Sequence, residues 1–219
     1  MVDRRSVLLG LAGASLSGCA APGSAVYQVI DSYRALNRAK AEYPVTRAQI
    51  DAQPLGVLGV QVEGGLKGLM LWEKREAGLD YWRSGNGVSL VLKHGRIIRS
   101  EGFPLDQLNS ELVEGEDPIG SKMERMRHYE LTRSASYSTG SVIRRHSLKF
   151  QGDTLIDLLN EEIVLDSWSE SLRGSRLEKP LKQVFQVVQS TGQVKRSVQH
   201  VSPETRVILE LLKPPSIGN

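Results

Sequence analysis

From residue 55 onward, apolar and polar residues alternate in short runs that are separated by Gly-, Asn- or Pro-containing turns. Alternation with a period of two is typical of strands, because successive side chains point to opposite faces of a sheet. Strands do not alternate here with helical segments of about 10–15 residues, which disfavours an α/β fold. We therefore expect a mainly β protein with an antiparallel barrel-like or sandwich fold.

The expected strands lie on both sides of a break rich in Pro, Asp and Glu that runs from residue 104 to 120. Asn86-Gly87, between two of them, is typical of a type I′ hairpin turn. The ranges before the break are 55–62, 66–74, 79–83, 88–93 and 96–100, and those after it are 125–133, 142–150, 155–165, 181–189, 194–201 and 205–212.

The stretches on the two sides of the break resemble each other weakly. Gly95-Arg-Ile-Ile-Arg-Ser100 is similar to Gly192-Gln-Val-Lys-Arg-Ser197, and each is followed by a proline. Two related β halves, at 55–103 and 121–214, would explain the similarity, and so would chance likeness between two hairpins. In either case we expect the β domain to extend over 26–214, with a tail at 215–219.

Before the strands, apolar residues recur at helical spacing and predict one N-terminal helix to about residue 40. Tyr43-Pro44 would end it, because the residue before a proline disfavours helical geometry. Thr46-x-x-Gln49 has capping-box spacing and predicts a further short helical turn. The apolar stripe of the first helix consists of Val26, Val29, Ile30, Tyr33 and Leu36.

The first 19 residues have the pattern of a lipoprotein signal peptide. An arginine pair precedes an apolar run over 7–16, which has the length of a secretory h-region and is shorter than the roughly 18 residues of a membrane span. Small residues at 17 and 18 precede Cys19, the only cysteine. This resembles the lipobox of bacterial lipoproteins, in which the cysteine carries a diacylglycerol and becomes the mature N-terminus. The resemblance implies a signal peptide at 1–18 and a lipidated tether at 19–25; an ordinary signal peptide with a chance cysteine is the alternative.

A lipidated Cys19 would also decide where the protein works. Two or more acyl chains hold a protein firmly on a membrane. In the lipoproteins that the motif resembles, a non-acidic residue such as Ala20 implies the outer membrane, with the protein facing the periplasm. The paired arginines also resemble a twin-arginine signal, so the Sec and twin-arginine export routes both stay open.

Composition and spacing argue against several function classes. The 28 Lys and Arg nearly balance the 25 Asp and Glu, so we expect no nucleic-acid partner. No Gly-x-Ser-x-Gly or phosphate-binding motif is present, and no two histidines stand four residues apart. We therefore assign no catalytic residue, no metal and no cofactor. His94 is expected in a turn, and outward-facing strand positions are expected for His128, His146 and His200.

Arginines with a nearby tryptophan form the strongest candidate for a glycan or partner surface, because guanidinium groups pair well with carboxylates. The alternative is that these arginines only prevent strand edges from aggregating. Acidic residues near aromatic ones leave a glycoside hydrolase as a further hypothesis. The candidate surface consists of Trp82, Arg83, Arg96, Arg99 and Arg196, and the acidic residues are Asp80, Glu161, Glu162 and Asp166.

Several segments, taken in order, resemble the YjbF/GfcB lipoprotein family. They are Thr46-x-x-Gln-Ile-Asp51-x-x-Pro54, Asp80-Tyr-Trp82-Arg-Ser-Gly-Asn86-Gly87, Gly95-Arg-Ile-Ile-Arg-Ser-Glu-Gly102-Phe-Pro-Leu-Asp106, Thr191-Gly192-Gln-Val-Lys-Arg-Ser197-Val-Gln199-His-Val-Ser-Pro203 and Leu211-Leu-Lys213-Pro214. The family is linked to group 4 capsule and exopolysaccharide operons. The resemblance implies a β-rich, barrel-like fold and a periplasm-facing lipoprotein with an accessory role in polysaccharide secretion.

The resemblance carries over no catalytic residue, so the first hypothesis is a non-enzymatic scaffold. Its expected partners are the membrane, through the lipid on Cys19, and other polysaccharide-secretion proteins. The alternatives are a glycan-binding module that guides the exported polymer, which would make polysaccharide a partner, and an envelope glycoside hydrolase.

Overall fold

The computed structural model describes residues 43, 45–65, 67–103, 105–175 and 177–216. Cys19, the signal peptide, the tether and the helix expected before residue 40 lie outside these residues. The described elements are α2 (Arg47–Asp51), β1 (Val57–Val62), β2 (Lys67–Glu76), β3 (Leu79–Arg83), β4 (Ser89–Lys93), β5 (Arg96–Glu101), β6 (Gln107–Gly115), β7 (Tyr129–Tyr137), β8 (Gly140–Asp157), β9 (Glu162–Gly174), β10 (Leu181–Val187), β11 (Val194–His200) and β12 (Arg206–Lys213).

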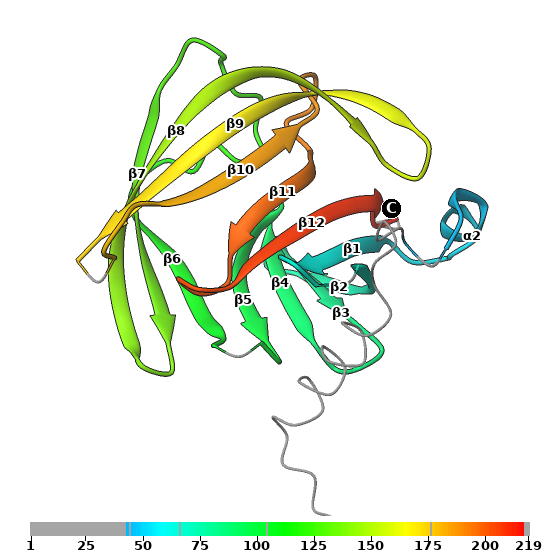
Figure 1. The fold of residues 1–219 in the computed structure, drawn as a ribbon, viewed down its shortest axis with the longest axis horizontal. Coiled ribbons are helices and arrows are strands. Elements are labelled where there is room, and N and C mark those ends of the chain that lie inside the picture. The colour runs from blue at the N-terminus through cyan, green and yellow to red at the C-terminus, as the bar shows by residue number, and fades with distance from the viewer. Residues whose placement is uncertain (1–42, 44, 66, 104, 176, 217–219) are drawn as a thin grey trace, which may run out of the picture.

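All twelve strands belong to one antiparallel sheet, in the order β5-β4-β3-β2-β1-β12-β11-β10-β9-β8-β7-β6. The sheet curls until its two ends come close together, so it forms a nearly closed barrel (Figure 1). The expected mainly β, barrel-like fold is confirmed. Because β1 pairs with β12, the ranges 55–103 and 121–214 share this one sheet.

β5 and β6 are the two edge strands of the sheet, and the Gln107 side chain bridges them. The Gln107 amide donates hydrogen bonds to the carbonyl oxygens of Ile97 and Ile98, at 3.1 and 3.2 Å, and the Ser100 hydroxyl accepts one from the Gln107 backbone N–H at 2.9 Å. These bonds satisfy polar backbone groups that would otherwise stand unpaired at two buried sheet edges.

Two apolar clusters fill the barrel interior, one formed mainly by β1–β5 and β12 and the other mainly by β7–β11. Inward-facing residues alternate with outward-facing ones along each strand, as a half-buried sheet requires. The first cluster is Leu58, Met70, Trp82, Leu90, Leu92, Ile97, Val201, Val207 and Leu209, and the second is Ile119, Met123, Leu131, Leu148, Trp168, Phe185, Val187 and Val194.

The connection between β6 and β7 helps to fill the barrel. Ile119 and Met123, both within it, are buried against Trp168 and Phe185. Gly120 has a φ of 90° and lies against His94, and a Cβ there would overlap that side chain. Part of the connection, around Ile119 and Met123, is therefore packed between the hairpin turns, whereas residues 126–128 are exposed.

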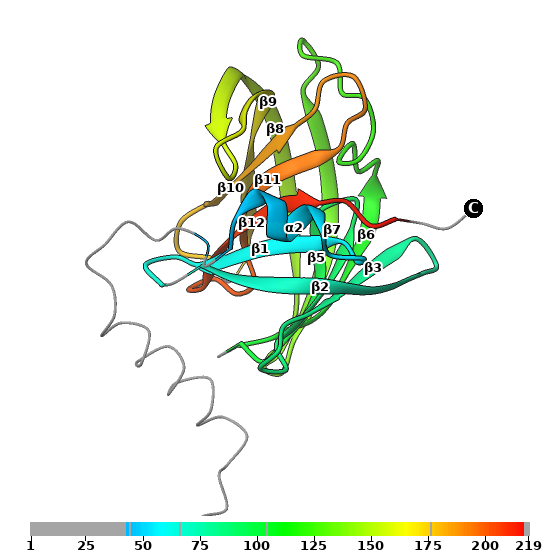
Figure 2. The same ribbon diagram turned by 90° about the vertical axis from the view of Figure 1, so that its right-hand side faces the viewer.

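The outer face of β1 and β12 is covered by the segment that enters the fold. Thr46 and Gln49 form both bonds of the expected capping box, and α2 buries Ile50 against Val57 and Leu212. Figure 2 shows α2 beside β1 and β12. Among the described residues, no helix has the length and hydropathy that crossing a membrane requires.

Three expectations about strands and turns were wrong. β6 lies inside the supposed break, and the expected strand over 155–165 contains a hairpin turn at Leu159-Asn160, whose φ values are 57° and 66°. A type I′ turn needs positive φ at both central residues. At Asn86-Gly87 only the glycine has it, whereas His94-Gly95 fulfils the condition with 52° and 90°.

Candidate functional site

The five residues of the candidate surface do not share one exposed face. Trp82 is only 2% exposed and packs in the first apolar cluster, and Arg96 is 3% exposed inside the barrel, which corrects their expected exposure. Arg83 and Arg99 are exposed on β3 and β5. Arg196 lies half-buried on the outer face, 3.3 Å from the Glu210 carboxylate.

Arg96 belongs instead to a buried network of charges between the two apolar clusters. Its guanidinium forms two 2.9 Å hydrogen bonds to Glu170 on β9 and a 2.7 Å bond to Asp117 on the β6–β7 connection. Asp117 also accepts a 2.9 Å hydrogen bond from Arg133, and His146 Nδ1 lies 3.1 Å from Glu170.

Burial and mutual pairing shift the pKa values of this network. Burial alone would raise the pKa of Glu170, but the Arg96 charge and the contact with His146 outweigh it and lower this pKa to about 2. Burial lowers the pKa of Arg133 to about 10, and the nearby Arg96 charge adds to the effect. Each charge thus stabilises its partner, so the network joins the barrel walls and leaves no unpaired carboxylate there for acid–base chemistry.

The carboxylates considered for a hydrolase are also engaged. Asp80 accepts two 2.8 Å hydrogen bonds from Arg75 and a third from Trp72. Asp166 binds Arg125 through bonds of 2.6 and 3.2 Å. Glu161 and Glu162 lie exposed at the β8–β9 hairpin turn, where Glu162 is the cross-strand partner of Asp157.

The histidines differ from expectation in part. His94 lies in a turn as expected, and His128 precedes β7 rather than lying within it. His146 faces inward against Glu170 and is 6% exposed, and His200 is 8% exposed but shares the face of Arg206. Burial lowers the pKa of His200. Within the described residues, no three His, Cys, Asp or Glu side chains are grouped as metal ligands.

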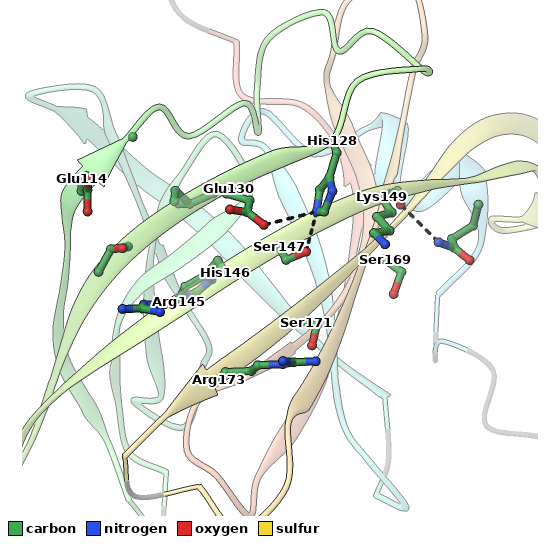
Figure 3. A pocket seen from close by; sticks show the side chains of 14 residues that line it. Glu114, His128, Glu130, Arg145, His146, Ser147, Lys149, Ser169, Ser171 and Arg173 are labelled. Carbon is green, nitrogen blue, oxygen red and sulfur yellow. Dashed lines mark hydrogen bonds and ion pairs between the residues drawn. The ribbon is translucent and has the colours of Figure 1, made fainter.

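The largest hollow is an open groove of about 790 Å³ on the outer face of β7, β8 and β9 (Figure 3). Most of its lining side chains are charged or carry hydroxyls. They are Glu114, Gly115, His128, Glu130, Leu131, Thr132, Arg145, His146, Ser147, Lys149, Gln151, Ser169, Ser171 and Arg173. Arg145 stands in the pair Arg144-Arg145, which the sequence also offers for pairing with carboxylates of a polysaccharide or partner; the other lining residues are not assigned to a binding surface by sequence.

Strand register places these side chains in rows across the groove. Arg145 on β8 is directly opposite Arg173 on β9, and Ser147 is directly opposite Ser171. The Ser147 hydroxyl also lies 2.6 Å from His128 Nε2, which joins the rim of the groove to its floor. The groove thus offers guanidinium and hydroxyl groups from β8 and β9, and the carboxylates of Glu114 and Glu130 from β6 and β7. These groups stand on a rigid sheet, which suits a binding surface.

Comparison with known proteins gives three consistent matches. The family model described as "Group 4 capsule polysaccharide lipoprotein gfcB, YjbF" matches residues 25–212. The uncharacterized lipoprotein GfcB of Escherichia coli K12 is 24% identical over 203 residues, which cover 89% of this chain and 91% of GfcB. The crystal structure of the hypothetical lipoprotein YmcC from the same organism has a TM-score of 0.68 at 21% identity and covers 86% of this chain and 97% of YmcC, which shows the shared fold.

Proposed function

Because the chain belongs to the YjbF family of group 4 capsule polysaccharide lipoproteins, we propose that it is a non-enzymatic accessory protein of capsule or exopolysaccharide secretion. Lipid on Cys19 holds it to the outer membrane, and its barrel faces the periplasm, where it acts as a scaffold for other secretion proteins.

The observation that carries this proposal is the contrast between the interior and the outer face of the barrel. Apolar clusters and the Arg96–Glu170 network occupy the interior, and the largest hollow is an open groove on the outside. Enzymes commonly work in enclosed, water-poor sites with groups poised for proton transfer. An open, polar outer groove supports a contact surface instead.

Lipid anchoring makes such a contact effective even when it is weak. The chain between Cys19 and Tyr43 can reach at most about 80 Å when fully extended, so the barrel stays in a thin layer beside the membrane. Confinement of two proteins to that layer raises their effective concentration. A scaffold of this kind needs no tight interface with its partners.

The proposal is tested by cross-linking in intact cells with a photo-reactive residue placed at exposed outer-face positions. We expect one or a few specific envelope proteins, and a loss of exported polymer when the gene is deleted. Cys19→Ser should release the protein from membranes and reduce the cross-links, with Ser17→Ala as a control for changes near the cleavage site. Membrane retention of Cys19→Ser would overturn the anchoring, and normal polymer export without the protein would overturn the accessory role.

A further inference from the structure

Two like charges stand directly opposite each other on the floor of the outer groove. Arg145 and Arg173 are cross-strand partners on β8 and β9, and both are exposed. Among the described residues, neither forms a salt bridge within 4.0 Å. Their guanidinium groups point apart in Figure 3, as two cations without a counterion between them are expected to do.

Within the same pair of strands, away from the exposed Asp157 and Glu162 at the hairpin end, one other like-charge pair is neutralised by the protein itself. Asp153 and Asp166 are also directly opposite on β8 and β9. Arg125 reaches over both, with hydrogen bonds of 2.7 and 2.6 Å to the two carboxylates. The acidic pair is thus neutralised from within the chain, whereas the basic pair in the groove has no bridging carboxylate among the described residues.

Hydroxyl groups and a further cation continue the row along the groove. Ser147 faces Ser171 two residues from the arginine pair, and Lys149 faces Ser169 two residues beyond that. At about 3.3 Å per residue, roughly 13 Å separate Arg145 from Lys149 along β8. Cations therefore stand at both ends of a row of hydroxyls.

We propose that this groove binds an acidic polysaccharide, with Arg145 and Arg173 bound to a carboxylate of the polymer and the serines bound to its hydroxyls. Guanidinium groups form short, charge-assisted hydrogen bonds with carboxylates. The inference rests on the proposed role in polysaccharide secretion and adds the charge class of the polymer and the place where it binds.

The chemistry of the lining favours a glycan over a protein partner. Leu131 is the only large apolar side chain in the lining, and it faces inward. Protein interfaces usually have aromatic or aliphatic anchors at their centre. A row of serines between cations lacks such an anchor but matches a ligand that carries hydroxyls and carboxylates.

The test measures binding of the detergent-solubilised full chain to oligogalacturonate, a uronic acid polymer, by calorimetry or fluorescence anisotropy. We expect binding that weakens as salt increases, since exposed charges are screened. Arg145→Gln combined with Arg173→Gln should weaken it about tenfold or more, because two charge-assisted contacts are lost. Both side chains are exposed, so the variant should melt at the temperature of the wild type. Arg83→Gln combined with Arg99→Gln removes the same charge from exposed positions on β3 and β5 and should bind normally.

Each other outcome overturns the inference. Equal binding by the groove variant, or loss in the Arg83/Arg99 control instead, would place the glycan elsewhere. Equal binding of a neutral dextran would show that charge is not recognised, and equally tight, competing binding of polyglutamate would point to an acidic protein. Cross-linking to envelope partners is a separate measurement. If the groove does not bind glycan, the scaffold role is therefore unaffected. If the scaffold role is wrong, polymer export stays unaltered when the gene is deleted.

Discussion

The Arg96 guanidinium and the Glu170 carboxylate meet inside the barrel through two parallel hydrogen bonds of 2.9 Å. They come from β5 and β9, which are not neighbours in the sheet, so the pair joins separate parts of the barrel wall. Asp117 extends the contact to the β6–β7 connection. Through these two ion pairs, Arg96 therefore ties together three parts of the fold that the backbone ladder does not join directly.

Removal of one partner should cost more stability than removal of both. Glu170→Gln leaves Arg96 buried with one counter-charge fewer, and we expect a loss of about 3–5 kcal/mol in the free energy of unfolding. Replacement of both residues, as Arg96→Met with Glu170→Gln, should cost less than the sum of the single changes Arg96→Met and Glu170→Gln. Urea denaturation of the four proteins measures this difference, and additive losses would show that the pair is not coupled.

The low pKa of Glu170 predicts an acid-dependent loss of stability. The pKa is about 2 in the folded protein against an ordinary value of 4.5. Because the folded value is the lower one, the contribution is complete above pH 4.5 and is lost as pH falls toward 2. At about 1.4 kcal/mol per pH unit, the difference corresponds to roughly 3 kcal/mol. The gap in unfolding free energy between wild type and Glu170→Gln should therefore narrow between these pH values, and a constant gap would contradict the assignment.

The packed connection between β6 and β7 predicts an unusual sensitivity at one glycine. Gly120 has a φ of 90°, and an added Cβ would overlap His94. Gly120→Ala should lower the free energy of unfolding by more than 2 kcal/mol through backbone strain and overpacking. Gly85→Ala is the matched control, because a Cβ there meets nothing within 4 Å. Equal thermal stability of the two variants would show that the connection can move away.

The local sequence pattern was sufficient to predict strands in which one face is apolar and the other is polar. Residues 79–83 form the expected strand because their alternation lies between turn residues on both sides. β6 escaped prediction because its buried side chains, Gln107 and Ser110, are polar, whereas large apolar residues such as Leu108 are exposed. One of its edges is also satisfied by Gln107 rather than by a strand. The turn at Leu159-Asn160 escaped because an apolar residue disfavours positive φ, and tertiary packing of the adjacent Leu158 overrides that preference.

The residues that come together in the candidate site could not be predicted from the local sequence pattern alone. Arg145 and Arg173 become partners only through the register of a long hairpin, so their pairing requires the structure. An arginine in a strand is normally read as outward-facing, and Arg96 breaks this rule because Glu170, far away in sequence, compensates its charge. The weak echo between Gly95 and Gly192 does mark two glycines that the packing requires, since a Cβ at either would crowd Val194 or Ser121.

The contacts of Tyr43, where the chain enters the barrel, predict an effect on stability and on proteolysis of the entering segment. Tyr43 donates a hydrogen bond to the buried Glu210 carboxylate, and burial and the Glu210 charge raise the pKa of its phenol, so it stays protonated. Its ring lies over Gly59 in β1, where a Cβ would overlap the ring. Gly59→Ala should therefore displace Tyr43, lower the unfolding free energy by about 1–3 kcal/mol and speed proteolysis between residues 43 and 54.

A double-mutant cycle separates the contact between Tyr43 and Gly59 from a general destabilisation of β1. In a Tyr43→Ala background, Gly59→Ala should cost little, because the overlapping ring is gone. Gly68→Ala on the neighbouring strand is the control, since a Cβ there has its nearest contact at 3.9 Å. An undiminished cost of Gly59→Ala without the tyrosine would mean that the strand itself rejects the methyl group. The coupling would show instead that the segment at Tyr43, through which the chain enters the fold, is fixed to the outer face of the barrel.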